Sequence, residues 1–187
     1  PDGAATRPAD AEGVRRALVT YGQAFERLLE GYYILDRNYN YDFHNRLFLR
    51  STPLLPSYRE AGRARVHEAE SLRASADQTV AAVRPSLDPG DPLGALLDDV
   101  RGYAAFSFDR APVLERMSQG FDRTQAGLQH STHMYEGEGK VLGVRLAEVL
   151  AKHQRVLTAP VIADLTDEFQ ATSRAVHDLY ANRIVGF

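Results

Sequence analysis

Two histidines and a methionine form the group of side chains in this sequence best suited to holding a metal ion. On a helix His130 shares a face with His133 or Met134, because residues three and four apart are neighbours. Imidazole with a thioether suits copper, and imidazole with the carboxylate of Glu136 suits zinc. The alternative is a polar face before a helix end, since two histidines at this spacing often arise by chance. A copper or zinc site at His130, His133 and Met134 is thus a hypothesis, and no other cofactor is predicted.

A second group with recognition chemistry is a run of tyrosines at positions 32–44, where four of the nine tyrosines fall within ten residues. Tyrosine combines a rigid apolar body with a polar tip, which suits contact with a ligand or a protein. The alternative, which we prefer for most of these rings, is that their hydroxyls reach the bundle edge and bond to backbone or arginine. The candidate contact surface, called here the tyrosine patch, comprises Tyr33, Tyr39, Tyr41, Phe43 and His44.

Acid–base chemistry would have to come from His153, His177 and Asp42. Their spacing matches no catalytic pattern, and a lone histidine on a helix seam is usually a satisfied core residue. The sequence lacks HExxH, GxSxG, Gly-rich phosphate loops and the Glu-x-x-His of ferritin-like metal sites. An enzyme with a pocket inside the bundle therefore ranks behind a binding protein and a metal-binding bundle.

The elements that must position these residues are helices. Apolar residues recur from Val14 to Tyr39 at alternating steps of four and three, which is the heptad pattern of a helix packed lengthwise on others. We expect this helix to begin at the N-cap Asp10 and to run to about Tyr39. Beyond it the Asn and Asp residues at 38–45 disfavour helix, so either the helix bends or a short second piece runs to Arg50.

Further helices are predicted after Pro56, after the Asp91 cap with Pro92 in the first turn, and on either side of Gly137–Gly139. Prolines at 112 and 160 kink or split the later ones. No segment alternates as a strand does. We therefore predict an all-α fold, an antiparallel up-down bundle of four main helices in four to six segments, with residues 10–187 as one domain and residues 1–9 as a disordered leader.

Composition narrows the function class. The 187 residues carry a net charge of −3, which argues against a nucleic-acid partner, and no stretch is apolar enough to span a membrane. There is no cysteine, which removes disulfides, thiolate metal sites and cysteine catalysis. The small, polar leader is typical of the stretch that follows a signal peptide or a lipid anchor, and a frayed terminus is the alternative. We expect export to the periplasm or cell envelope rather than a cytoplasmic location.

The paired tyrosine Tyr32-Tyr33 followed by Tyr39-Asn40-Tyr41-Asp42 resembles a family of exported bacterial lipoproteins of unknown function. In that family a paired tyrosine precedes a Tyr-x-x-Asp stretch within an all-helical domain. The resemblance covers positions 32–42 and implies export and helical structure, but no activity. The sequence as a whole predicts an exported, non-enzymatic helical binding module whose protein or small-molecule ligand is unknown, with a possible N-terminal membrane tether.

Overall fold

A computed structural model describes residues 8–47, 56–109 and 144–159. Within those ranges the chain forms helices and no strand, which confirms the all-α prediction. The elements are α1 (Pro8–Leu47), α2 (Pro56–Val83), the short 3-10 helix η1 (Arg84–Ser86), α3 (Pro92–Phe108), a helical segment at 144–152 and α6 (Gln154–Leu157). None of the described helices is long and apolar enough to cross a membrane.

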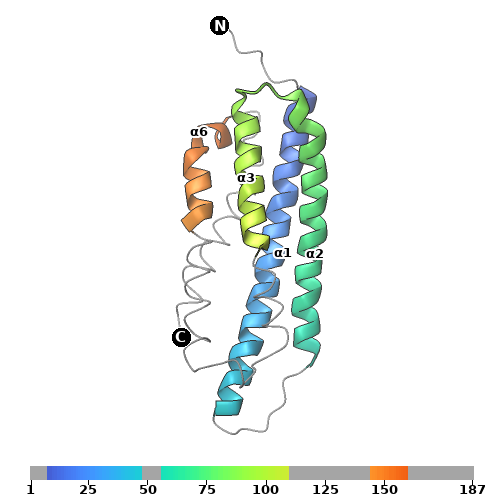
Figure 1. Cartoon of the computed structure of the whole chain (residues 1–187), viewed down its shortest axis with the longest axis vertical. Helices are drawn as coiled ribbons and strands as arrows, with labels where there is room; N and C mark the ends of the chain where they lie inside the picture. Colours follow the sequence, from blue (N-terminus) through green and yellow to red (C-terminus); the bar gives the residue numbers. More distant parts are fainter. Residues whose placement is uncertain (1–7, 48–55, 110–143, 160–187) are drawn as a thin grey trace.

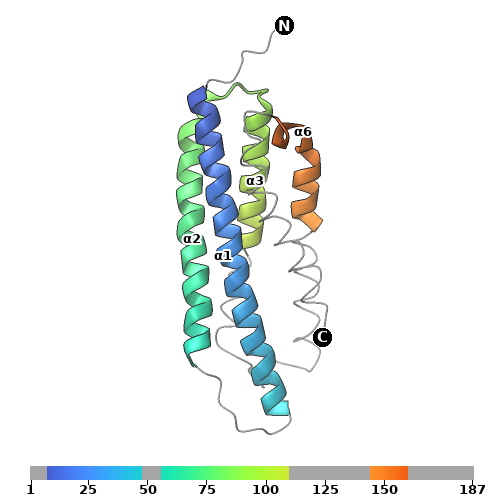
Figure 2. The same cartoon turned by 180° about the vertical axis from the view of Figure 1, so that it is seen from behind.

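Helices α1 and α2 form the long axis of the molecule and pack along each other in opposite directions (Figures 1 and 2). Helix α3 is shorter and lies beside α1, running from the same end as α1 begins. The segment 144–152 and α6 lie on the far side of α3 from α2. Because α3 covers only part of the length of α1, the C-terminal part of α1 extends past the end of α3 (Figure 1).

The heptad of α1 supplies the centre of the core, as predicted. Val14, Tyr21 and Leu35 lie on the seam and are fully or almost fully buried, and Leu18, Phe25 and Leu28 between them are buried as well. Facing them are buried residues of α2, α3 and the C-terminal elements. These are Ala69, Ala76, Val80, Leu93, Leu96, Leu97, Val100, Ala104, Leu146 and Leu157. Burial of this apolar surface, worth roughly 25 cal/mol per Å², is the main stabilising term for such a fold.

The ends of α1 differ from the sequence prediction. The helix begins at Pro8, so Asp10 lies in its first turn instead of capping it, and there its Oδ1 accepts a hydrogen bond from Ser86 Oγ at 2.7 Å. At the other end α1 continues without a break to Leu47. Of the two alternatives for the Asn- and Asp-rich stretch, the separate second piece is therefore wrong, because helix propensity is a weak preference that the surrounding structure can override.

Two glycines allow α1 and α2 to approach closely. A Cβ added at Gly31 would stand 2.8 Å from Val66 Cγ2 and 3.0 Å from the backbone oxygen of Gly62. A Cβ added at Gly62 would in turn stand 2.7 Å from Leu35 Cγ. The two backbones therefore approach each other at two positions without side chains, close to the beginning of α2.

A polar network connects the three long helices near the buried aromatic residues. Tyr21 of α1 is fully buried, and its hydroxyl donates a 2.5 Å hydrogen bond to Asp77 Oδ1 of α2. Arg101 of α3 and Arg73 of α2 each approach that carboxylate at 3.5 Å. Burial and the adjoining carboxylate raise the pKa of Tyr21 well above its usual value. The phenol therefore stays protonated and serves as a donor.

The first turn of α3 agrees with the sequence prediction. Asp91 Oδ1 accepts from the backbone N–H of Leu93 at 2.8 Å, with Pro92 in the first turn, so the predicted cap of α3 is confirmed. The charged face of α2 carries several ion pairs. Arg65 pairs with Glu68 and with Glu30 of α1.

Candidate functional site

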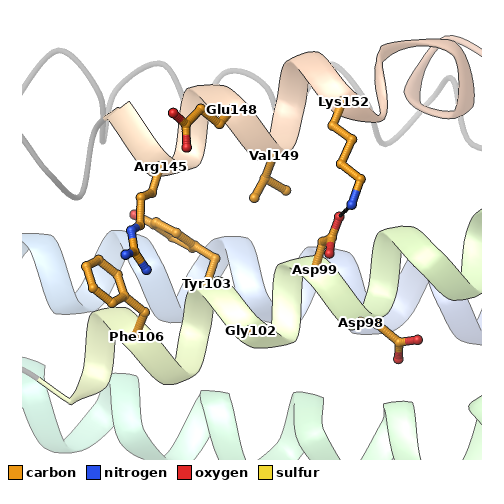
Figure 3. Close-up of a pocket in the computed structure, with 9 residues that line it drawn as sticks. All are labelled: Asp98, Asp99, Gly102, Tyr103, Phe106, Arg145, Glu148, Val149 and Lys152. Atoms are coloured by element: carbon orange, nitrogen blue, oxygen red, sulfur yellow. Dashed lines mark hydrogen bonds and ion pairs between the residues drawn. The ribbon is translucent and has the colours of Figure 1, made fainter.

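A groove between α3 and the segment 144–152 is the candidate binding site in the described part of the chain. It encloses about 560 Å³ and opens to the surface. Its walls come from α3 on one side and from 144–152 on the other (Figure 3). The lining residues are Asp98, Asp99, Gly102, Tyr103, Phe106, Arg145, Glu148, Val149 and Lys152.

One end of the groove is formed by a cation stacked on an aromatic ring. The guanidinium carbon of Arg145 lies 3.8 Å from the centroid of the Phe106 ring, a cation–π contact between the two walls. Tyr103 lies beside this pair in Figure 3. Its side chain is 5 % exposed, and burial raises the pKa of its phenol to about 12.

The core supports this end of the groove through a chain of aromatic rings. The ring of Tyr103 meets Phe25 edge to face at 4.9 Å, and Phe25 stacks on Tyr21 at 6.1 Å. Offset and edge-to-face pairs each add about 0.5–1.5 kcal/mol beyond the area that they bury. The position of Tyr103 in the groove is therefore fixed by the seam of α1.

The other end of the groove is held together by a carboxylate, an ammonium group and an imidazole. Asp99 Oδ2 accepts a 2.6 Å hydrogen bond from Lys152 Nζ and another of 2.6 Å from His153 Nε2. These two donors hold the pKa of Asp99 below its usual range, so the carboxylate is ionised at neutral pH. An ionised carboxylate can only accept hydrogen bonds. The proton in this contact is therefore carried by Nε2 of His153, which donates to Asp99.

Between its two ends the groove has a flat floor. Gly102 carries no side chain, and a Cβ added there would meet nothing within 4 Å. Asp98, beside it, turns to Arg84, whose Nε lies 3.1 Å and whose Nη2 lies 3.1 Å from Asp98 Oδ2. A planar group could therefore lie against the α3 backbone without displacing a side chain.

The residues predicted from sequence fall mostly outside this site. The metal candidates His130, His133 and Met134 lie outside the described residues, as does His177. The tyrosine patch and Asp42 fall on the C-terminal part of α1, where the backbone is helical and the side chains are not described. That part of α1 extends past the end of α3, so the patch and the groove lie at different levels of the molecule (Figure 1).

Two of the predicted residues are placed by the structure. His153 is buried, with 5 % of its surface exposed and its Nε2 bonded to Asp99, as expected for a core histidine. Another histidine, His67, is exposed on α2 and pairs with Glu70, so it lies apart from His153. Within the described residues no three His, Cys, Asp or Glu side chains gather as metal ligands would.

Sequence reasoning missed the groove itself. Asp99 reads as part of a solvated acidic pair in the sequence, yet its carboxylate joins two helices. Arg145 and Phe106 lie 39 positions apart, and nothing local marks them as partners. The only sequence signal was an isolated lysine, Lys152, next to a seam histidine in a chain whose other basic residues, apart from Lys140, are arginines.

Comparison with known proteins gives no match to this chain among family models, curated proteins or solved structures. The resemblance of positions 32–42 to exported lipoproteins accordingly stays a prediction. The function has to be argued from the groove and its chemistry.

Proposed function

We propose that this protein is a non-enzymatic binding module, built as an up-down bundle of four main helices, that takes a small organic ligand in the groove between α3 and 144–152. The observation that carries the proposal is the composition of the groove. Ligand sites in proteins are concave and combine apolar and aromatic walls with a few polar groups that orient the ligand. Here Phe106, Tyr103 and Val149 supply the apolar walls, and Arg145 is an exposed cation at one end.

The Asp99–His153 pair supports binding over catalysis. A carboxylate bonded to an imidazole is the arrangement that orients a general base in many enzymes. In those sites the second imidazole nitrogen faces the substrate. Here the imidazole is buried and is not among the residues that line the groove, and the same Asp99 oxygen also holds Lys152. The pair is suited to fastening 144–152 to α3, and hence to setting the width of the groove.

The tyrosine patch and export of the protein remain part of the proposal on the strength of the sequence. A partner that contacts the patch would bind at a different level from the groove, since that stretch of α1 lies beyond α3 (Figure 1). The absence of cysteine is compatible with export.

Amide NMR spectra of the protein with a mixture of neutral and charged small aromatic compounds test the proposal. We expect shift changes that cluster at the backbone amides of Gly102 and Val149. Gly102→Leu, which fills the floor of the groove, should abolish them. Ala105→Leu adds the same side chain to an exposed position of α3 outside the groove and should leave them intact. Shift changes that persist in Gly102→Leu, or that never occur at these two amides, would rule the groove out as the site.

A further inference from the structure

We infer that the ligand of the groove is a small organic carboxylate with a flat apolar body, and that Arg145 binds its charged end. This inference rests on the proposed function, because it names the class of ligand that the same groove would take. It follows from three features of the site: which charges are already paired, where the guanidinium lies, and what surface lies beside it.

Most of the charges that line the groove are satisfied by partners within the protein. Asp98 is bonded to Arg84, and Asp99 is bonded to Lys152. His153 adds a second bond to Asp99, so Lys152 and Asp99 form a closed group at one end. A charged ligand would have to disrupt that group in order to bind there.

Arg145 is different, because its described contact is the face of the Phe106 ring and no ion pair with it occurs among the described residues. Glu148, one turn along the same helix, also lines the groove, and Figure 3 marks no hydrogen bond or ion pair between its carboxylate and the guanidinium. Arg145 is thus the lining cation that keeps its charge for a ligand. At the guanidinium, charge complementarity selects an anion.

The stacking of Arg145 favours a carboxylate over other anions. The Arg145 guanidinium carbon lies 3.8 Å from the centroid of the Phe106 ring, so the N–H groups that are not turned to the ring stay available for an acceptor. Two parallel N–H groups match the two oxygens of a carboxylate, and this planar fork is what distinguishes arginine from lysine. Because the ring holds the side chain in place, part of the entropy cost of binding has already been met before the ligand arrives.

The surface next to Arg145 suits a flat apolar body. Gly102 leaves the α3 backbone bare, and Val149 covers it from the opposite wall. Tyr103 closes the inner side with a ring that the core holds edge to face on Phe25. An aromatic ring that carries a carboxylate can therefore lie between the walls with its charged end at Arg145.

Calorimetric titration of the full chain with benzoate, benzyl alcohol and benzylamine tests this inference, with amide NMR spectra to locate each compound. A hydrogen bond to a charged group contributes about 1.5–3 kcal/mol, which corresponds to roughly 10- to 150-fold in affinity. We expect benzoate to bind the wild type at least about tenfold more tightly than benzyl alcohol, and benzylamine to bind most weakly. Arg145→Met should weaken benzoate binding to the level of the alcohol.

Arg155→Met is the matched control, because Arg155 is an exposed arginine of α6 that does not line the groove. It should leave all three affinities unchanged, whereas an equal loss in both variants would overturn the inference. Equal binding of the three compounds at Gly102 and Val149 would also overturn it and leave the proposed function standing. If none of the three perturbs those amides, both the inference and the proposed function fail.

Discussion

The imidazole Nε2 of His153 lies 2.6 Å from Asp99 Oδ2, and this contact fastens the segment that carries Arg145 to α3. The histidine is buried, and it stands at the turn between the helical segment 144–152 and α6. The geometry of the groove therefore depends on a hydrogen bond at its edge, between two residues that are 54 positions apart in the chain.

Removing that bond should destabilise the protein. Asp99→Ala leaves the N–H of a buried imidazole without its acceptor, and a buried unsatisfied group costs about 1–3 kcal/mol. Urea unfolding followed by helical circular dichroism measures the loss. Asp88→Ala, in an exposed loop, should change the free energy of unfolding by less than about 0.5 kcal/mol. Equal effects of the two substitutions would show that the bond contributes nothing.

The same pair predicts a dependence on acid pH. Lys152, and then His153, lower the pKa of Asp99 in the folded protein relative to the unfolded chain. A carboxylate with a depressed folded pKa contributes stability above its unfolded value of about 3.9 and loses that contribution as the pH falls through the folded value. Stability measured from about pH 5 to pH 2 should fall less steeply in Asp99→Asn than in the wild type. Parallel curves would contradict the pairing.

Tyr21 predicts the opposite dependence at alkaline pH. Burial and the bond to Asp77 raise the pKa of its phenol, so its contribution to stability is complete below the unfolded value of about 10 and is lost as the pH rises above it. Tyr21→Phe should cost about 0.5–1.5 kcal/mol at neutral pH, because the ring stays and only the hydrogen bond is lost. Tyrosinate absorbance during alkaline titration should show that one tyrosine fewer titrates late in this variant. If the wild type and Tyr21→Phe lose stability identically above pH 10, the bond is absent.

Two glycine-to-alanine substitutions should act in opposite directions. Alanine favours helix over glycine by about 0.5–1 kcal/mol, so Gly102→Ala, whose Cβ meets open space, should stabilise the protein by that amount. Gly31→Ala places a Cβ 2.8 Å from Val66 Cγ2 and should instead destabilise by about 1–3 kcal/mol. Thermal unfolding of the two variants beside the wild type measures both changes. A gain in stability for Gly31→Ala would mean that α1 and α2 are farther apart than described.

The sequence predicted the parts of the fold that depend on short-range pattern. The heptad from Val14 identified the buried face of α1, and Asp91 followed by Pro92 identified the start of α3, because periodicity and capping act within a few residues. The sequence left open whether α1 continues past the asparagines or gives way to a second piece, because residue propensities there are weak; the structure shows one helix to Leu47.

The groove could not be predicted in the same way. Its features are pairings between distant positions: Asp99 with His153, and Arg145 with Phe106. Each of these residues fits an ordinary role when read alone, as a surface acid, a core histidine, a surface arginine or an apolar helix residue. Only the packing of 144–152 on α3 brings a cation, an aromatic ring and a bare stretch of backbone to one place.

The most direct test of binding in the groove is to locate benzoate on the protein by intermolecular nuclear Overhauser effects in a saturated sample. Binding in the groove predicts effects from the benzoate ring protons to the methyl groups of Val149 and the Hα protons of Gly102. These effects should disappear in Gly102→Leu, because the added side chain fills the floor on which the ring would lie. Effects confined to the ring protons of Tyr39 and Tyr41 on α1, with none to Val149 or Gly102, would contradict binding in the groove and would place the binding surface on the tyrosine patch instead.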